Sequence, residues 1–593
     1  MRQLLTGDEA IARGAFEAGV HFAAAYPGTP STEILENISK YEEICAEWAP
    51  NEKVALESAI GASIAGGRAM ASMKHVGLNV AADPFFTFAY TGVNGGAVII
   101  TADEPGQHSA QNEQDNRNYA KSAKVPMFEP ANSQECKDMV IEAYRISEEF
   151  DCPVLMRMTT RVCHGKSIVE LGERAEVAIR EYKKDVKKYC CVPANAKVLR
   201  RNLEVKLAKL KEYAETTPFN FVEENEGAKM GVITSGACYH YAKEAFGEKA
   251  SFLKLGFSFP MPDDMITVFC QKYDEVYIVE ENDPFIEDRV KLLGFQCHGK
   301  DMLPKFGEMT PDVIRKHFFG IETPTIEYND EMVVDRPPTL CAGCPHRGFF
   351  YELGKRQDIM VSSDIGCYSL GFAKPYNATD SLICMGGGFS IGHGAQKVFN
   401  MNENKKRVVS VMGDSTFLHS GITSLMDVVY NNSNAVSVIL DNRITGMTGH
   451  QENPGTGYNA KGESATAIDI EGIVRAMGIK HIRTVDPNNL TDMKKVLDDF
   501  LALDEPSVII TKWPCALKKF SKEDKEQFAG AFTKKMKVNE DKCIGCKLCM
   551  KCGCPAISFD GGKKKAKIDT IQCVGCGVCS QLCPKEAIEV KEV

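Results

Sequence analysis

The sequence lacks several features that would place the protein in a membrane or on nucleic acid. No apolar run approaches the roughly 18 residues that a membrane-spanning helix needs. The first residues, MRQLLTGDEAIARGAF, carry acidic groups where a signal peptide needs an apolar core, so export is not expected. An excess of basic residues is also absent, because the formal net charge is −10. We therefore expect a cytoplasmic protein with neither a membrane nor a nucleic-acid partner.

Cysteine, in contrast, is abundant. The chain has 23 cysteines among 593 residues, and nine of them fall between Cys543 and Cys583 at the spacing of metal ligands. This spacing predicts metal-bound thiolates in a reducing interior rather than disulfides. A chain of this length is too long for one hydrophobic core, so three or four domains are expected.

The cysteine-rich tail is an internal duplication in which both halves end in Cys-Pro. This arrangement is that of bacterial ferredoxins with two [4Fe–4S] clusters, in which the fourth cysteine of each run ligates the other cluster. The first run has one extra residue and an extra Cys552, which leaves either Cys552 or Cys554 as its fourth ligand; Pro555 favours Cys554. The predicted ligand sets are Cys543, Cys546, Cys549 and Cys583 for one cluster, and Cys573, Cys576, Cys579 and Cys554 for the other.

A second signal lies in residues 408–449, which read as strand, helix, strand. Asp414 follows the first predicted strand and Asn442 follows the second, so both are expected at the carboxyl edge of a parallel sheet, where ligands bind. A carboxylate, an amide oxygen and the backbone carbonyl of Ile444 are suitable ligands for Mg²⁺. Donors to a diphosphate are available from the segment Gly413, Ser415 and Thr416.

Either Asp414 or Asn442 alone would be explained as a turn or helix-cap residue. The pair, separated by one helix and one strand, resembles the thiamine diphosphate motif, usually Gly-Asp-Gly followed by Asn-Asn. The sequence departs from that motif at Ser415 and Asp441.

Thiamine diphosphate also needs a carboxyl group beside its aminopyrimidine. The segment 51–70, NEKVALESAIGASIAGGRAM, is small and apolar after Glu57. A carboxylate at the head of such a segment is costly to bury without a task, and burial would raise its pKa and let it share a proton. Glu57 is the first candidate and Glu52 the second. The simpler explanation is a carboxylate that faces the helix dipole.

Changes in composition along the chain predict the order of the domains. An α/β domain is expected in residues 1–175, and Thr29 lies in its strand-to-helix loop YPGTPSTE. Residues 176–226 form a charged helical connector, residues 227–330 a small α/β domain, and residues 335–515 a second doubly wound domain. Residues 536–593 form the cysteine-rich tail. The C-x-x-C of Cys341 and Cys344, with the adjacent His346, is compatible with zinc binding, redox chemistry or a structural role. No second pair lies nearby at zinc-finger spacing, so zinc is disfavoured there.

Taken together, the motifs YPGTPSTEI, ALESAIGASIAGG, CAGCPHRG, SSDIGC, GDS…DN and the cysteine tail resemble one family along nearly the whole chain. That family is the alpha subunits of indolepyruvate:ferredoxin oxidoreductases. The chain is similar, more loosely, to pyruvate and other 2-oxoacid:ferredoxin oxidoreductases. The resemblance implies an α/β fold with several doubly wound parallel-sheet domains, two of them binding thiamine diphosphate, and a C-terminal ferredoxin-like α+β domain.

The resemblance also implies a function. It implies oxidative decarboxylation of aryl pyruvates, coenzyme A as acyl acceptor, ferredoxin as electron acceptor, and a smaller beta subunit in a hetero-oligomer such as α2β2. By motif, Glu57 matches the cofactor-activating glutamate and Thr29 a substrate-side threonine, while Asp414 and Asn442 match the Mg²⁺ ligands. Cys344, His346 and Cys367 match cofactor-proximal loops, with His346 as a candidate catalytic group.

Three alternatives remain at this stage. The substrate is pyruvate or another 2-oxoacid in the first. In the second, the chain is an electron-transfer subunit without thiamine chemistry, but such a subunit would not need Glu57, Asp414 and Asn442. In the third, it is a non-redox thiamine decarboxylase or synthase, but such an enzyme would not need the cysteine tail.

Overall fold

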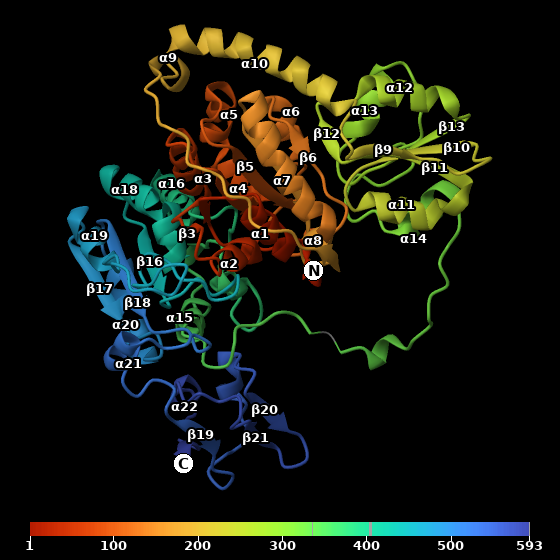
Figure 1. Cartoon of the computed structure of the whole chain (residues 1–593). Helices are drawn as coiled ribbons and strands as arrows, with labels where there is room; N and C mark the ends of the chain where they lie inside the picture. Colours follow the sequence, from red (N-terminus) through yellow and green to blue (C-terminus); the bar gives the residue numbers. More distant parts are fainter. Residues whose placement is uncertain (335, 402–405, 592–593) are drawn as a thin grey trace. The chain divides into compact units, whose positions relative to one another are not determined.

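A computed structural model describes residues 1–334, 336–401 and 406–591. The chain forms two compact units, Met1–Tyr328 and Asn329–Val593. Their elements are labelled in chain order in Figure 1. Among the described residues, no helix has both the length and the apolar character needed to cross a membrane.

The first unit is built on a seven-stranded sheet in the order β12-β6-β7-β5-β4-β2-β3. All neighbours are parallel except β12 and β6, which are antiparallel. Its strands are β2 (Phe22–Ala25), β3 (Cys45–Trp48), β4 (Ala69–Lys74), β5 (Ala97–Asp103), β6 (Met127–Phe128), β7 (Val154–Thr159) and β12 (Phe257–Phe259). A separate antiparallel pair is formed by β1 (Arg2–Thr6) and β8 (Lys166–Glu170).

Helices cover both faces of this sheet. Because successive strand residues point to opposite faces, Met70 and Ala71 belong to different cores. The core of Met70 includes residues of α1 (Gly7–Glu17), α2 (Thr32–Ile38) and α7 (Ser133–Phe150), whereas that of Ala71 includes residues of α3 (Glu52–Ile64) and α5 (Ala82–Thr91). Shorter helices are α4 (His75–Val80), α6 (Arg117–Ala123) and α8 (Thr160–His164). The expected doubly wound architecture is confirmed.

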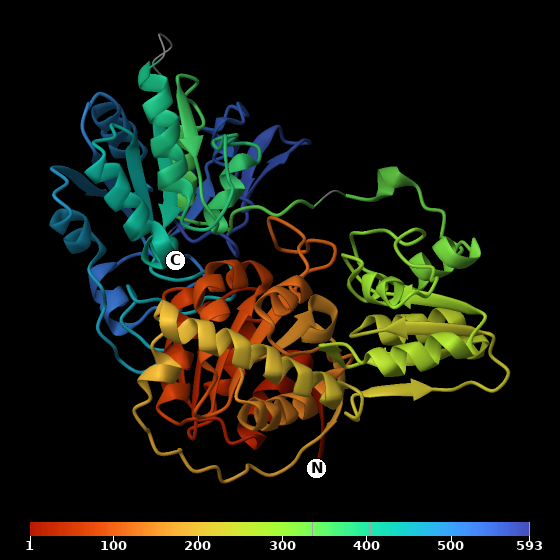
Figure 2. The same ribbon diagram turned by 90° about the horizontal axis from the view of Figure 1, so that it is seen from above.

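A smaller α/β domain completes the first unit. Its sheet has the order β13-β10-β11-β9. The strands are β9 (Asn220–Glu223), β10 (Met230–Thr234), β11 (Ala250–Leu255) and β13 (Glu275–Val279), and the helices are α11 (Cys238–Phe246), α12 (Asp263–Lys272), α13 (Phe285–Leu292) and α14 (Pro311–Phe319). The expected charged connector contains α9 (Val186–Tyr189) and the long helix α10 (Pro193–Ala214), which crosses the first domain in Figures 1 and 2.

The second unit contains a five-stranded parallel sheet in the order β14-β15-β16-β18-β17. The strands are β14 (Ile359–Ser362), β15 (Arg407–Gly413), β16 (Val436–Asp441), β17 (His481–Val485) and β18 (Ser507–Lys512). One core includes residues of α15 (His346–Leu353) and α20 (Leu490–Leu501), and another includes residues of α16 (Gly388–Met401), α18 (Ile422–Tyr430) and α19 (Ile470–Ala476). The predicted strand–helix–strand in residues 408–449 is confirmed, because β15 and β16 pair in parallel.

The cysteine-rich tail has two short antiparallel ribbons. One pairs β19 (Lys535–Val538) with β22 (Ile588–Lys591), and the other pairs β20 (Ile557–Asp560) with β21 (Lys565–Ile568). A short helical turn lies in each half, at Leu548–Cys552 and in α22 (Val578–Gln581). Most of its buried core consists of cysteines and a few small aliphatic residues, which suits a domain that is folded around metal.

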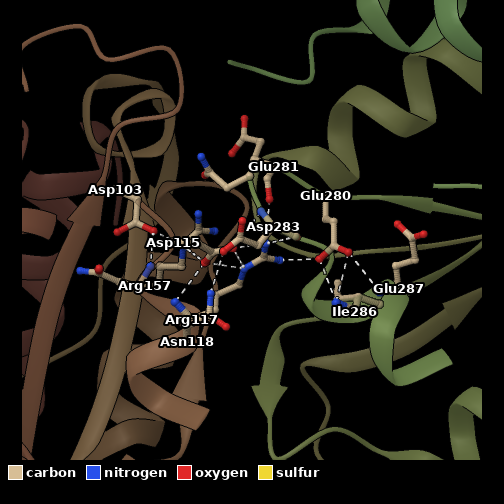
Figure 3. Close-up of polar contacts among 12 residues, drawn as sticks. Asp103, Asp115, Arg117, Asn118, Arg157, Glu280, Glu281, Asp283, Ile286 and Glu287 are labelled. Atoms are coloured by element: carbon tan, nitrogen blue, oxygen red, sulfur yellow. Dashed lines mark hydrogen bonds and ion pairs between the residues drawn. The ribbon is translucent and has the colours of Figure 1, made fainter. Parts of the chain in front are cut away.

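A buried ionic network joins the two domains of the first unit (Figure 3). The Arg117 side chain is fully buried and donates to the carboxylates of Asp115, at 2.6 Å, and Glu280, at 2.7 Å. It also donates to the backbone carbonyl of Glu281 at 2.7 Å. Asp115 belongs to the first domain and Glu280 to the second, so this one guanidinium holds groups from both.

We predict that Arg117→Ala lowers the free energy of unfolding of the protein by about 3–5 kcal/mol, because it removes the nearest cation of two buried carboxylates, Asp115 and Glu280. The matched control is Arg145→Ala, which removes a half-exposed arginine paired with Glu142 and Glu149. It should cost no more than about 1 kcal/mol. Urea unfolding followed by circular dichroism measures both, and equal costs would contradict the role given to Arg117.

Candidate functional site

The carboxyl edge of the five-stranded sheet brings Asp414 and Asn442 together. Gly413, the last residue of β15, is in register with Leu440 of β16. Asp414 directly follows β15, Asn442 directly follows β16, and both are buried. The side-chain amide of Asn453 donates to Asp414 Oδ2 at 3.4 Å. The structure thus places the two predicted Mg²⁺ ligands at neighbouring strand ends.

The residues that follow these strand ends are tied to one another. The Thr445 hydroxyl donates to Ser415 Oγ at 2.9 Å, and the backbone N–H of Ile444 donates to Asn442 Oδ1 at 3.3 Å. Thr416 is buried, and its hydroxyl donates to the backbone carbonyl of Ile365 at 3.1 Å. Hydroxyl and backbone groups that are suited to bind a diphosphate are therefore gathered at the same edge.

The electrostatics of this edge suit a bound cation. Burial, followed by the nearby charge of Asp441, raises the pKa of Asp414 to about 7. Burial also raises the pKa of Asp441, against the opposing effect of Arg443. A buried carboxylate of this kind is costly when charged, and a divalent cation would offset that cost. The donors present are hard oxygens, as Mg²⁺ prefers.

Two glycine-rich loops are fastened beside this edge by Asp364. Its buried carboxylate accepts hydrogen bonds from the backbone N–H groups of Ile365, Gly386 and Gly388, at 2.7, 2.8 and 2.7 Å. Burial raises the pKa of Asp364 to about 6 even with these donors. This residue fixes the SSDIGC loop against the loop that begins α16.

His346 lies at the start of α15 and is buried. Its ring meets that of Tyr368 edge to face, with centroids 6.1 Å apart. The Tyr368 hydroxyl is 2.9 Å from Thr416 Oγ1, so His346 is one aromatic ring away from the Asp414 edge. Burial lowers the pKa of His346 to about 4, and the imidazole is therefore neutral at physiological pH.

Four cysteines converge next to the Asp414 edge. Cys341 and Cys344 share a turn, in which the Cys344 N–H donates to the Cys341 carbonyl at 3.1 Å. After burial, the charges of Cys367 and Cys515 contribute to the raised pKa of Cys344. Burial, together with Cys515 and Cys341, raises the pKa of Cys367 to about 11. The Cys341–Cys344 turn, Cys367 and Cys515 therefore lie within electrostatic reach of one another.

Sequence reasoning missed Cys515, because a single cysteine carries no spacing. Its backbone N–H donates to the carbonyl of Asn442 at 2.9 Å, so it lies against the second predicted Mg²⁺ ligand. The signal that could have found it is positional. Cys515 shortly follows β18, and β18 is the neighbour of β16 in the sheet.

The spacing of the cysteines fits clusters rather than single ions. Among the described residues, no three cysteines bring their sulfurs to within 4.8 Å of one another. A tetrahedral zinc site requires four ligand atoms about 2.0–2.3 Å from one ion, and hence close together. Wider cysteine sets suit a larger iron–sulfur group.

The tail contains two cysteine-lined cavities. The first is lined by Cys543, Cys546, Cys549 and Cys583, which is the ligand set expected from the sequence. The second is lined by Cys573, Cys576 and Cys579 together with both Cys552 and Cys554. The Cys552 thiol donates to the carbonyl of Cys549 at 3.1 Å.

The loop that carries Cys341 and Cys344 packs directly on the second tail cavity. A Cβ added at Gly343 would lie 1.9 Å from Val574 Cγ2, so only glycine permits this approach. Arg347 is fully buried and donates to the backbone carbonyls of Cys552, at 3.2 Å, and Gly553. Gly343 and Arg347 both line the cavity. The four-cysteine set therefore adjoins the second tail cavity within one unit.

In the first unit, the structure corrects the environment expected for Glu57. Its side chain is 44% exposed and pairs with Lys53, so it is not the desolvated carboxylate that the sequence predicted. The buried carboxylate is that of Glu52, which is 5% exposed at the first position of α3. A Cβ on Gly77 would lie 2.7 Å from Glu52 Cγ, which shows how closely α4 packs on this side chain.

Thr29 lies in the loop between β2 and α2, next to a lysine that sequence reasoning missed. Lys74 is the last residue of β4, and its side chain would be 3.2 Å from a Cβ at Gly28. Its ammonium group lies 3.4 Å from the Glu104 carboxylate. Burial lowers the pKa of Lys74. A strand-end cation beside Thr29 is suited to bind a carboxylate substrate.

Three family models match the chain. Residues 13–216 match the model described as pyruvate flavodoxin/ferredoxin oxidoreductase, thiamine diP-bdg. Residues 364–511 match the model described as thiamine pyrophosphate enzyme, C-terminal TPP binding domain. Residues 535–585 match the 4Fe-4S dicluster domain.

The chain is also similar to named proteins over nearly its full length. It is 40% identical to the indolepyruvate oxidoreductase subunit IorA of Pyrococcus horikoshii, over 99% of this chain and 96% of that protein. It is 41% identical to the same subunit of Archaeoglobus fulgidus, over 99% and 97%. A solved structure of 2-oxoglutarate:ferredoxin oxidoreductase from Magnetococcus marinus aligns with a TM-score of 0.44 and 16% identity, over 53% of this chain and 64% of that one.

We predict that Asp414→Ala and Asn442→Ala each abolish binding of Mg²⁺–thiamine diphosphate while the iron content stays unchanged. Each substitution removes an oxygen ligand from the strand-end site, and the cysteines are untouched. Release and quantitation of the cofactor, with iron analysis of the same sample, measures this. Full cofactor occupancy in both variants would contradict the metal assignment.

Proposed function

Because the chain belongs to the family of indolepyruvate oxidoreductase subunit IorA, the catalytic subunit of a thiamine diphosphate-dependent 2-oxoacid:ferredoxin oxidoreductase, we propose a complete reaction for it. An aryl pyruvate such as indolepyruvate, coenzyme A and two oxidised ferredoxins give the aryl-acetyl-CoA, CO₂, two reduced ferredoxins and a proton. The observation that carries this proposal is the packing of the Cys341–Arg347 loop. Its His346 packs on Tyr368, which bonds Thr416 of the Asp414 edge, and its Gly343 and Arg347 line the second tail cavity. Pyruvate or another 2-oxoacid as substrate remains the alternative.

In this proposal the chain's residues hold and orient the cofactor. Asp414, Asn442 and the carbonyl of Ile444 ligate Mg²⁺, and Gly413, Ser415 and Thr416 bind the diphosphate. When bound, thiamine diphosphate supplies the nucleophilic carbon and the electron sink for loss of CO₂, which no protein side chain offers. The two carboxylates at this edge favour a divalent cation over an unaccompanied phosphate group.

We propose Glu52, the second candidate from the sequence, for the proton-sharing role; Glu57, which the motif match favours, stays the alternative. A carboxyl group that exchanges a proton with the aminopyrimidine works best when water is excluded, and Glu52 is the buried member of the pair. Asn51 supplies the α3 cap, because its side chain accepts from the Val54 N–H at 2.9 Å.

Substrate contacts are proposed from the loops of the first unit. Thr29 offers a hydroxyl for the keto group, and Lys74 offers a cation for the substrate carboxylate. His346, being neutral, is suited to accept or donate one hydrogen bond rather than to supply positive charge.

The electron route in this proposal includes a third [4Fe–4S] cluster, held by Cys341, Cys344, Cys367 and Cys515. Cys344 is buried and Cys367 and Cys515 are part-buried, and burial together with neighbouring cysteines raises the pKa of each of these three thiols. Such thiols are costly as free thiolates and become favourable when iron takes up their charge. The tail cavities hold the two clusters expected from the sequence, and Cys554 rather than Cys552 serves as the fourth ligand of the second set. None of the 23 cysteines forms a disulfide, in keeping with a reducing cytoplasm.

The relatives are named as one subunit of an oxidoreductase, which implies at least one further chain in the enzyme. We propose that this partner is the smaller beta subunit of the oxidoreductase, in an assembly such as α2β2, and that ferredoxin docks as the electron acceptor. Coenzyme A would enter as the second substrate.

We predict that Glu52→Gln retains the cofactor but lowers turnover by about 10²–10⁴-fold, because an amide cannot share a proton with the aminopyrimidine. Glu57→Gln is the matched control on the same helix and should keep nearly full activity. Steady-state turnover, cofactor content and the rate of deuterium exchange at thiazolium C2 separate the two. Loss of exchange in Glu57→Gln alone would return the role to Glu57.

We predict that Cys515→Ala lowers the iron content from about twelve to about eight atoms per chain, because one of three four-iron clusters is lost. Cys384→Ala is the control, since Cys384 is exposed and lies outside the three cysteine sets. Iron and sulfide analysis of anaerobically purified protein measures both variants. A parent protein with about eight iron atoms would contradict the third cluster.

A further inference from the structure

Away from the proposed cofactor and cluster sites, three side chains of the first unit converge at the start of α1. Asp8, Glu33 and His164 bring their ligand atoms to within 4.8 Å of one another, the one such group among the described residues. They come from three separate elements, which are the first turn of α1, the first turn of α2 and the last residue of α8.

Asp8 is the unusual member of this group, because it is fully buried. Neither of its carboxylate oxygens accepts a hydrogen bond from an N–H or O–H group of the described residues. Its one polar partner among the described residues is the thiol of Cys163, a weak donor that is also fully buried. No lysine or arginine among the described residues forms an ion pair with it. Buried carboxylates in such surroundings are rare, because the desolvation cost is large unless a cation or donors compensate it.

The Asp8 side chain does not cap the N-terminus of α1. The cap of α1 is provided by Thr6 and Glu9. The Glu9 N–H donates to Thr6 Oγ1 at 3.1 Å, and the Thr6 N–H donates to Glu9 Oε2 at 2.8 Å. This reciprocal capping box satisfies the helix start without Asp8. The carboxylate of Asp8 is therefore available for another partner.

Close backbone packing holds the three elements in place. A Cβ at Gly7 would lie 2.1 Å from the carbonyl oxygen of Val162, so α1 and α8 approach as closely as glycine allows. His164 Nε2 lies 3.9 Å from Glu33 Oε2, too far for a hydrogen bond. Glu33 Oε2 is itself buried and without a hydrogen-bond donor among the described residues. The three groups thus face one another without bonding one another, as ligands around a shared ion would.

We propose that Asp8, Glu33 and His164 form a binding site for a divalent transition-metal ion, distinct from the proposed Mg²⁺ and iron–sulfur sites. Two carboxylates and one imidazole make a mixed oxygen and nitrogen set. The imidazole favours zinc or another transition metal over Mg²⁺ and Ca²⁺, and the adjoining Cys163 thiol favours zinc further. Three protein ligands leave coordination positions for water, on the side where Glu33 and His164 are part-exposed.

The ion would brace the loop that carries Thr29. Glu33 lies in the first turn of α2, directly after the loop YPGTPS, so a bond from Glu33 to a shared ion ties the end of that loop to α1 and α8. This role is structural and does not depend on the proposed reaction.

The test is the zinc content of the full-length protein after incubation with Zn²⁺ and desalting. We expect about one zinc per chain in the parent and its loss in Asp8→Asn and in His164→Gln, with the iron content unchanged in all three. Asp8→Asn keeps the shape of the buried side chain, and His164→Gln alters a part-exposed one, so both should fold. His108→Gln is the control, because His108 is part-exposed and faces Glu308 in the same unit, outside the cluster; it should retain the zinc.

Cysteines that have lost iron also bind zinc, so the ligand shell must be identified. X-ray absorption at the zinc edge should show oxygen and nitrogen neighbours at about 2.0–2.2 Å with at most one sulfur. A shell of four sulfurs at about 2.3 Å, or zinc retained by both variants, would overturn the proposal. Absence of zinc binding by the parent would also overturn it and would leave Asp8 and Glu33 as a carboxyl pair that shares a proton.

Discussion

The burial of Arg347 is the interaction on which the second unit depends. Its guanidinium group is fully buried, and among the described residues all its hydrogen-bond acceptors are neutral: the Tyr376 hydroxyl and the carbonyls of Leu340, Cys341, Cys552 and Gly553. These acceptors satisfy the N–H donors of the guanidinium group but do not neutralise its positive charge. An uncompensated buried cation is strongly destabilising. Burial raises the pKa of Cys344 and of Cys576, and the Arg347 charge opposes that rise at both thiols, although they lie in different cysteine sets. Thiolate-bound clusters on both sides would supply the missing negative charge.

Much of this architecture could be predicted from the sequence, where spacing repeats or where a polar residue ends a strand. The cluster ligands of the tail could be predicted because the same cysteine spacing occurs twice. The positions of Asp414 and Asn442 could be predicted because each residue follows a β-branched apolar run. The parallel pairing of β15 and β16 places the ends of these two strands side by side. The departures from the usual motif are also explained. Asp441 accepts the Arg443 N–H at 3.1 Å, and Ser415 accepts from Thr445, so both side chains stabilise the edge locally.

Other features of the site could not be predicted from the sequence, for physical reasons. Glu52 and Glu57 lie in a helix that is rich in alanine, glycine and serine on all sides. The sequence therefore does not indicate which side of this helix is buried. Packing against Gly77 buries Glu52, whereas Glu57 stays half-exposed. Cys515 is one cysteine after a strand, and its relation to Cys341, Cys344 and Cys367 exists only once β18 is placed beside β16. Asp8 likewise acquires its partners through the close approach of α1 to α8 at Gly7, which no linear pattern encodes.

The packing of the second unit also assigns an order to the proposed clusters. The cavity lined by Cys573, Cys576 and Cys579 includes Gly343 and Arg347 from the loop beside the four-cysteine set. The cavity of Cys543, Cys546 and Cys549 is lined only by described residues of the tail, from Val538 to Ile588. Electrons that leave the Asp414 edge would thus meet the four-cysteine set first, the Cys573 cluster next and the Cys543 cluster last. Because Arg347 bonds the Cys341 carbonyl and lines the cavity of the Cys573 set, its charge would favour the more negative, reduced state of the two proposed clusters beside it.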